Sequence, residues 1–282
     1  MIDFDGRGAS MFAVRTSVRR VMPLAVLLLL LGGCGGERNI GAAGGPSGTA
    51  GAATGSPSPA PSDAAGCQGA APHGQRVTFG PEGAANLVGV VFGTGRTGMV
   101  LAHQSRADRC QWSAYAEESA KAGYRVLTFD FPGDGDSPAG LGNDAAVGAA
   151  VAYLRGQGAQ AVVLIGASMG GNAVLAAAPR ITPPVAGVIS LSAPAVFQGL
   201  DAGAAVKNLA VPVLYAVCQK DTGFAEDAAA LYAATPATHP RRLVVAPGCG
   251  SHGVQLADPA YQPEAGLVRP TITEFLAAYA PA

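Results

Sequence analysis

The most informative stretch of this chain is AVVLIGASMGG, residues 161–171. Its first five residues are apolar and three of them are β-branched, which predicts a buried strand. The strand leads into G-x-S-x-G, and the Ala-rich residues 172–178 predict a helix after it. A turn this sharp leaves no room for side chains two places before and after its apex, where Gly166 and Gly170 stand. The apex residue, Ser168, is therefore expected to present its hydroxyl above the end of the strand, in front of the helix N–H groups.

Apolar runs and helical patterns alternate on both sides of this stretch. Eight segments have the composition of strands: residues 76–79, 86–92, 98–102, 124–131, 161–165, 185–191, 211–217 and 241–246. The first two are expected to form a hairpin. Helical spacing is found in residues 110–122, 144–155, 172–178, 224–234 and 267–279. Because most strands are continuously apolar, we predict an α/β fold with a mainly parallel, eight-stranded sheet and helices on both faces.

Four polar residues follow the carboxyl ends of predicted strands: His103, Ser168, Asp221 and His252. Parallel sheets bind their ligands at this edge. A serine hydroxyl becomes a nucleophile when a base takes its proton and an acid orients that base. We predict Ser168 as the nucleophile and His252, in the Gly-rich loop after the last strand, as the base. Asp221 follows the neighbouring strand and is predicted to be the acid.

Other acidic residues are alternatives for that role. Glu226 and Asp227 come next after Asp221 but are expected to lie on the following helix. The carboxylates at 130, 134 and 136 follow a strand on the other side of the nucleophile. They are expected to shape a loop or to line a substrate pocket.

An oxyanion intermediate needs two preorganised N–H donors. The backbone of Met169, at the start of the helix behind the nucleophile, is the predicted first donor. The second is expected from the loop after the third strand, with Ser105 as the first choice and Gln104 as the second. His103 is expected to brace this loop.

With these residues the chain resembles the α/β-hydrolase superfamily over residues 76–281. It is similar in particular to the dienelactone-hydrolase-like members and the small serine esterases. The matching motifs are LAHQ at 101–104, GDGDS at 133–137 and GASMG at 166–170, followed by Asp221 and His252. The order Ser, Asp, His is that of this fold. Gln104 departs from the pattern, because the family usually has Gly after the histidine. The resemblance implies hydrolysis of carboxylic esters or thioesters through an acyl-enzyme, without a cofactor.

The connection between the sixth and seventh strands limits the site. Many members of the superfamily carry a helical cap there, whereas this chain has only the nineteen residues 192–210. We expect one short helix at most and a shallow, open site. Trp112, Phe197 and Phe224 are candidates for apolar walls or for the core.

Two other functions are compatible with these residues. An acyltransferase or a peptidase would use the same nucleophile and differ in the group that accepts or donates the acyl moiety. A binding protein of the cell envelope could use the fold without catalysis, although the predicted triad argues against it.

The N-terminus predicts export. Three arginines between positions 15 and 20 precede the apolar residues 21–31, which are too few for a permanent membrane span. The sequence L-G-G-C that ends at Cys34 resembles a bacterial lipobox. It implies that residues 1–33 are a signal peptide, that Cys34 carries diacylglycerol and that the protein is anchored to the membrane of the cell envelope. The true start is Met1 or Met11.

Residues 34–75 are rich in Gly, Ala, Pro and Ser and bury too little apolar surface to fold, so they are predicted to be a flexible tether. The folded domain then spans residues 76–282. After removal of residues 1–33, 14 Lys and Arg face 17 Asp and Glu, without a basic run. This balance gives no reason to expect a nucleic-acid partner.

Four further cysteines remain after Cys34. An even number in an exported protein favours disulfides, and three pairings are possible. Cys218 and Cys249 follow adjacent predicted strands, which favours the pairs Cys218–Cys249 and Cys67–Cys110 over the other two pairings and over buried free thiols. No spacing of residues predicts a metal site.

Overall fold

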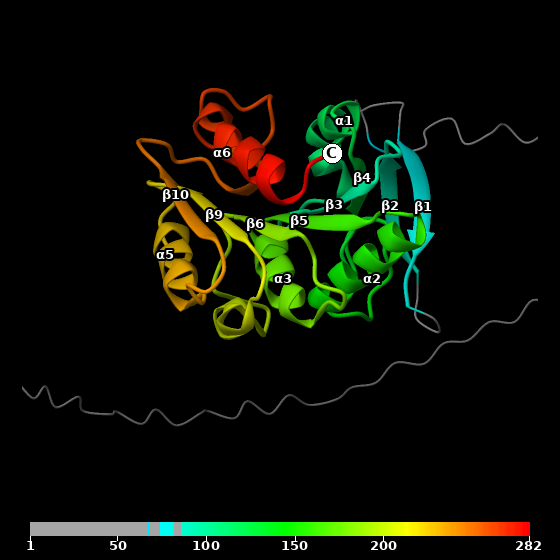
Figure 1. Ribbon diagram of the computed structural model, residues 1–282, viewed down its shortest axis with the longest axis horizontal. Coiled ribbons are helices and arrows are strands. Elements are labelled where there is room, and N and C mark those ends of the chain that lie inside the picture. The colour runs from blue at the N-terminus through cyan, green and yellow to red at the C-terminus, as the bar shows by residue number, and fades with distance from the viewer. Residues whose placement is uncertain (1–66, 68–73, 82–85) are drawn as a thin grey trace, which may run out of the picture. The chain divides into compact units, whose positions relative to one another are not determined.

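The computed structural model describes residue 67, residues 74–81 and residues 86–282, which all belong to one compact unit, Pro57–Ala282. Its centre is an eight-stranded sheet in the order β1-β2-β4-β3-β5-β6-β9-β10 (Figure 1). β1 and β2 form the predicted hairpin, β2 is antiparallel to β4, and all other pairs are parallel. The strands are β1 (Gln75–Phe79), β2 (Leu87–Phe92), β3 (Thr97–Ala102), β4 (Arg125–Phe129), β5 (Ala161–Ala167), β6 (Gly187–Leu191), β9 (Val213–Cys218) and β10 (Arg241–Ala246).

Helices cover both faces of the sheet, as Figure 1 shows. On one face lie α1 (Ser113–Lys121) and α6 (Glu264–Tyr279). On the other lie α2 (Asn143–Gly156), α3 (Met169–Ala177) and α5 (Phe224–Ala234). Side chains alternate along β5: Val163 and Ile165 pack with α1 and α6, and Leu164 packs with α2 and α3. A strand buried on both faces must be apolar at every position, which is what its sequence shows.

The predicted elements are present, with shifted boundaries. The segment predicted as one helix from residue 110 is divided into a 3₁₀ turn, η1 (Arg109–Trp112), and α1. The side chain of Asp108 accepts a hydrogen bond from the N–H of Cys110 at 2.8 Å and so fixes the start of the turn. β4 ends at Phe129 rather than at residue 131, because the N–H of Phe131 bonds to a histidine side chain instead of to a strand.

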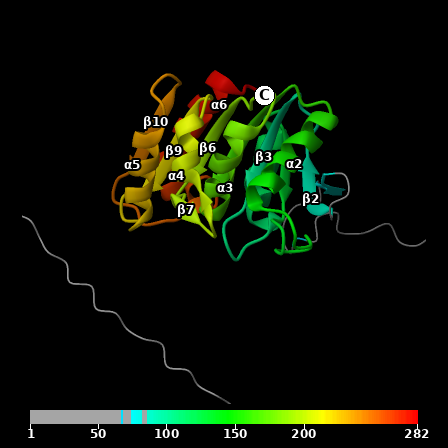
Figure 2. The same ribbon diagram turned by 90° about the horizontal axis from the view of Figure 1, so that it is seen from below.

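The connection from β6 to β9 contains no cap domain over residues 192–210, all of which are described. It folds into two short antiparallel strands, β7 (Val196–Phe197) and β8 (Leu200–Asp201), followed by α4 (Ala202–Ala205) and the 3₁₀ turn η3 (Val206–Asn208). The side chain of Asn172 donates to the carbonyl oxygens of Pro194 and Leu200 at 3.0 and 3.2 Å. These bonds attach the connection to α3, and β7 and α4 lie beside α3 in Figure 2.

Two disulfides are present, Cys67–Cys110 and Cys218–Cys249, with Cα atoms 5.4 and 5.2 Å apart. They are the pairs that the sequence favours.

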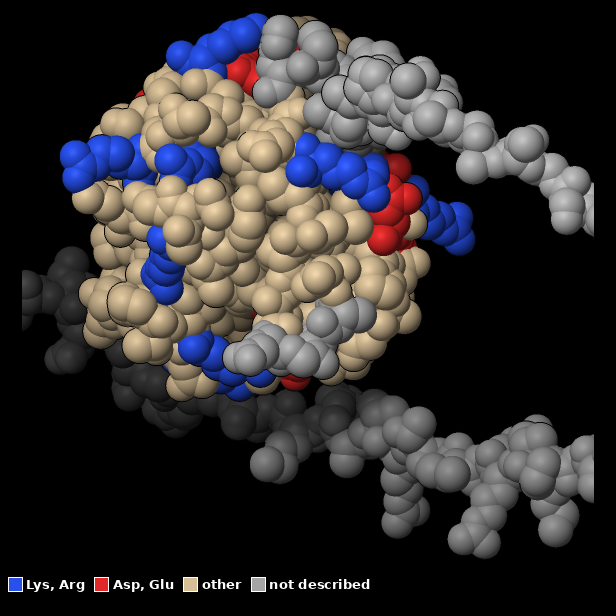
Figure 3. Space-filling view, turned by 90° about the vertical axis from the view of Figure 1, so that its right-hand side faces the viewer, with Lys and Arg blue, Asp and Glu red and all other residues tan. Residues whose placement is uncertain are grey.

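The predicted signal peptide, Cys34 and most of the tether lie outside the described residues. Within residues 67, 74–81 and 86–282, no helix has the length and apolar character needed to cross a membrane. Lys and Arg side chains are scattered over the face shown in Figure 3.

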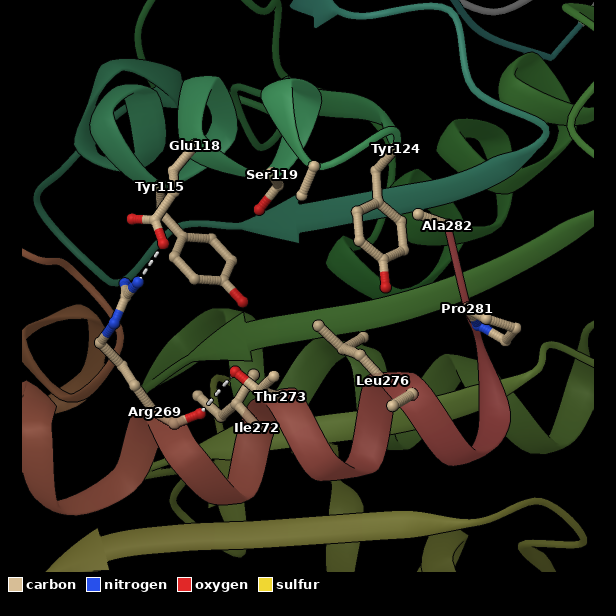
Figure 4. Close-up of a pocket in the computed structure, with 12 residues that line it drawn as sticks. Tyr115, Glu118, Ser119, Tyr124, Arg269, Ile272, Thr273, Leu276, Pro281 and Ala282 are labelled. Carbon is tan, nitrogen blue, oxygen red and sulfur yellow. Dashed lines mark hydrogen bonds and ion pairs between the residues drawn. The ribbon is translucent and has the colours of Figure 1, made fainter.

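A groove between α1 and α6 has a volume of about 390 Å³ (Figure 4). Tyr115 and Tyr124 line it, and Arg269 of α6 pairs with Glu118 of α1 at one end. Burial raises the pKa of the Tyr115 hydroxyl well above its ordinary value, which keeps it neutral. None of the predicted triad or oxyanion residues lines this groove.

Candidate active site

Ser168 occupies the sharp turn between β5 and α3. Its backbone has φ 51° and ψ −114°, in the left-handed half of conformational space that side chains rarely adopt. The turn is held because the Ser168 N–H donates to the carbonyl of Leu191 in β6 at 2.8 Å. A Cβ atom on Gly166 would lie 2.7 Å from the N atom of Gly171, and one on Gly170 would lie 2.7 Å from the carbonyl oxygen of His103. Both glycines are therefore required by close backbone approach, as the motif predicts.

His252 and Asp221 form a hydrogen bond, with Nδ1 2.8 Å from Oδ2. A carboxylate oxygen only accepts, so Nδ1 of His252 carries the proton of this bond. The His252 side chain is 29% exposed and that of Asp221 is 9% exposed, so the ring is accessible while its partner is covered. Phe224 packs against the ring, with centroids 4.4 Å apart.

The loop that carries His252 lies against the turn that carries Ser168. A Cβ atom on Gly253 would be 3.3 Å from the Cβ of Ala167, the residue before Ser168. The two loops are more than eighty residues apart in the chain. The tertiary structure thus brings the loop of the predicted base against the turn of the predicted nucleophile at the carboxyl edge of the sheet.

The alternative acids are engaged elsewhere. Glu226 accepts a hydrogen bond from the N–H of Gly223 at 2.8 Å and caps the start of α5. Asp227 accepts from the N–H of Ala195 at 3.1 Å and supports the β6–β9 connection. Of the three acids considered for the site, only Asp221 is bonded to His252.

The predicted oxyanion donors differ in what they contact. Met169 is the first residue of α3, where a backbone N–H has no carbonyl partner within the helix. The N–H of Gln104 donates to the side-chain oxygen of Gln111 at 3.0 Å. The second candidate for the second oxyanion donor is therefore already hydrogen-bonded within the protein. Ser105 lies in an exposed turn and remains the prediction for the second donor.

His103 is fully buried and joins two loops. Its Nε2 accepts from the N–H of Phe131 at 3.0 Å, so its Nδ1 carries the proton and donates to the Gln104 carbonyl at 2.8 Å. Burial lowers the pKa of His103 below its ordinary value of 6.5. A neutral ring with both nitrogens engaged is a brace, in agreement with the role expected from the sequence.

A buried ion pair shapes the neighbouring loops. The guanidinium of Arg109 pairs with Asp130, which is fully buried, and with Asp136 at 2.8 Å. Asp130 also accepts from the backbone N–H groups of Arg109 and Asp136, at 2.7 and 2.9 Å. Hydrogen bonds and charge from Arg76 and Arg109 lower the pKa of the Asp136 carboxyl.

Asp130 and Asp136 therefore shape the loops, one of the two roles expected from the sequence. Asp134 is partly exposed and stands 4.0 Å from Nε2 of His103. No sequence pattern points to Arg109, because a single arginine just before a predicted helix is ordinary. Only the folded chain shows its partners.

The aromatic candidates separate into core and site. Trp112 is fully buried in the core under α1, and Phe197 is half-buried in the β6–β9 connection. Phe224 contacts His252 and is the candidate wall that touches the triad. Within the part of the chain that the structure describes, no group of three or more His, Cys, Asp and Glu side chains could hold a metal ion.

Comparison with known proteins identifies the same architecture. Residues 94–210 match the family model described as the alpha/beta hydrolase fold. The comparison with curated protein sequences found no match. The strand order and this match together show that the chain has the α/β-hydrolase fold.

Solved structures of the same fold are similar to most of this chain. An esterase of Pyrococcus furiosus is 17% identical with a TM-score of 0.57, covering 73% of this chain and 91% of its own. A thermophilic esterase from Thermogutta terrifontis is 21% identical with a TM-score of 0.57, covering 73% and 99%. A monoacylglycerol lipase of Paleococcus ferrophilus is 18% identical with a TM-score of 0.56, covering 68% and 98%. At these identities the likeness establishes the fold.

Proposed function

We propose that this protein is a serine hydrolase of the small-esterase, dienelactone-hydrolase-like type that cleaves carboxylic esters or thioesters. The observation that carries the proposal is the Asp221–His252 hydrogen bond at 2.8 Å, in a loop that contacts the Ser168 turn. An acid-oriented imidazole beside a strained serine is the arrangement that activates a hydroxyl for attack on an acyl carbon.

The reaction proceeds in two halves. Ser168 Oγ attacks the acyl carbon while Nε2 of His252 takes the hydroxyl proton, and Asp221 stabilises the resulting imidazolium. The oxyanion is held by the N–H groups of Met169 and Ser105. The tetrahedral intermediate collapses, the alcohol or thiol leaves with the proton from His252, and the acyl group remains on Ser168. Water, deprotonated by His252, then attacks the acyl carbon; the bond to Ser168 Oγ breaks, Oγ takes the proton back from His252, and the carboxylic acid is released.

The structural relatives support an ester as the substrate. Two of those described above are esterases and the third is a monoacylglycerol lipase. The short β6–β9 connection is bonded to α3 rather than built into a cap, which suits substrates that reach an open site.

We also propose that the enzyme works outside the cytoplasm. Residues 1–33 direct export, diacylglycerol on Cys34 anchors the protein in the envelope membrane, and the residues between Cys34 and the disulfide-bonded Cys67 tether the domain. Two disulfides in the domain suit an oxidising compartment. In the cell, Cys34→Ser should move the protein from the membrane fraction to the soluble fraction, and a wild-type protein already soluble would contradict the anchor.

Labelling with a fluorophosphonate, followed by peptide mapping, tests the catalytic proposal. The label should be found on Ser168 and should be lost in Ser168→Ala and in His252→Ala. Ser192→Ala is the matched control, because Ser192 is also buried, follows a strand and has φ 50°. Labelling lost only in the Ser192 variant, or absent from folded wild-type protein, would overturn the assignment. A labelled enzyme that releases product only with an added alcohol or amine acceptor would be a transferase.

A further inference from the structure

Glutamine side chains bind the backbone of the loops around the proposed site. The side-chain oxygen of Gln255 accepts the N–H of His252 at 2.9 Å, and that of Gln219 accepts the N–H of Gly248 at 3.0 Å. Both of these bonds lie on the side of the β9 and β10 loops. Gln104 differs because it reaches from the loop after β3 to the loop after β10.

The carboxamide of Gln104 is packed against the residues that follow His252. Its oxygen accepts the N–H of Val254 at 3.4 Å, across 150 positions of the chain. It also lies so close to Gly253 that a Cβ atom there would overlap it. Gly253 contacts Ala167 as well. The carboxamide therefore lies between the turn that carries Ser168 and the loop after β10 that carries His252, which we call the base loop.

The backbone of Gln104 is fixed on both sides. Its N–H donates to the side chain of Gln111 at 3.0 Å, and its carbonyl accepts from Nδ1 of His103 at 2.8 Å. His103 is in turn bonded to Phe131 in the loop after β4. The Gln104 side chain therefore extends from a fixed backbone, so a hydrogen bond from its carboxamide restrains the loop that carries Val254.

We propose that Gln104 is a positioning residue. It couples the loop after β3, which carries the proposed oxyanion donor Ser105, to the base loop and so holds His252 over Ser168. The base loop is attached to the β9 side by the Cys218–Cys249 disulfide and Gln219, and Gln104 attaches it on the β3 side. A glycine, which the superfamily usually has at this place, has no side chain for such a bond. The inference rests on the proposed function, since it assigns Gln104 to the same triad.

Three substitutions separate the bond from the volume of the side chain. Gln104→Met keeps the length but cannot accept the Val254 N–H, whereas Gln104→Glu still can. On a short-chain p-nitrophenyl ester, the Met variant should lose about 10- to 100-fold in kcat, with KM within about threefold of wild type, because a small displacement of a catalytic group has effects of this order. The Glu variant should recover most of kcat. Gln157→Met, on the exposed end of α2, is the control and should behave as wild type.

The donor can be removed from the other side by Val254→Pro, because proline is tolerated in the first turn of a helix and Val254 lies in η4 (Gly253–Leu256). If both changes remove one bond, the double variant Gln104→Met/Val254→Pro should lose no more than the worse single variant. Unchanged kcat in Gln104→Met, equal loss in the Met and Glu variants, or fully additive losses would overturn the coupling. Turnover retained by Ser168→Ala would instead overturn the proposed function, so the two failures are distinguishable.

Discussion

Removal of the Cys218–Cys249 disulfide should cost this domain a large part of its stability. The two cysteines are 31 positions apart, and their cross-link restricts the unfolded chain. The loop-closure relation for that separation gives about 3.7 kcal/mol of unfolding free energy. In a domain of this size each kcal/mol corresponds to roughly 2–4 °C. We therefore expect Cys218→Ala/Cys249→Ala to lower the unfolding midpoint by roughly 7–15 °C.

The same variant should keep most of its activity at temperatures where it remains folded. The loops on either side of the disulfide are also joined by backbone bonds: the N–H of Gln219 donates to Ala246 and that of Lys220 donates to Cys249, both at 2.9 Å. These bonds do not depend on the sulfur atoms. Thermal and urea unfolding followed by circular dichroism, together with ester turnover at 20 °C, measure the two effects separately.

The second disulfide supplies the matched comparison. Cys67 and Cys110 are 43 positions apart, for which the same relation gives about 4 kcal/mol. Cys67→Ala/Cys110→Ala should therefore destabilise the protein to a similar extent, and a reducing agent should affect wild type at least as much as either variant. A loss below about 1 kcal/mol in the Cys218→Ala/Cys249→Ala variant would refute the loop-closure argument, which gives stabilisation of several kcal/mol.

Three further outcomes follow from the site. Asp221→Asn should lower kcat by about 10³- to 10⁴-fold at an unchanged unfolding midpoint, because an amide no longer selects the Nδ1–H tautomer of His252. Steady-state kinetics measure this loss, and a near-normal kcat would exclude Asp221 as the acid. Gly170→Ala should destabilise the fold by about 1–3 kcal/mol in urea, because its Cβ would overlap the backbone of residues 102 and 103; wild-type stability would mean that the turn can relax. The lowered pKa of buried His103 means that the unfolded chain takes up a proton below about pH 6.5 and the folded chain does not, so stability should fall as pH falls from 7.5 to 5.5. His103→Gln should flatten that dependence, and an equal slope in both proteins would contradict a neutral buried ring.

Much of this fold can be predicted from local sequence patterns. Buried strands of a parallel sheet must be apolar on both faces, so segments such as residues 162–165 are recognisable without their neighbours. The Ser168 turn is equally local, because its steric demands fall on Gly166 and Gly170, two places to either side. Asp221 and His252 could be placed at the same edge because each follows a strand of one parallel sheet.

Contacts between loops that are distant in sequence, by contrast, could not be predicted before the chain was seen folded. The partners of Arg109 are one such case, since Asp130 and Asp136 lie beyond α1 and β4 and no periodic pattern relates them. The use of the Gln104 N–H by Gln111 and of its side chain by Val254 is another, and it turned a predicted backbone donor into a link between loops. Hydrophobic periodicity determines which residues are buried, because burial acts on each segment separately. Hydrogen bonds depend on distances of about 3 Å, and those are set only when the segments have packed.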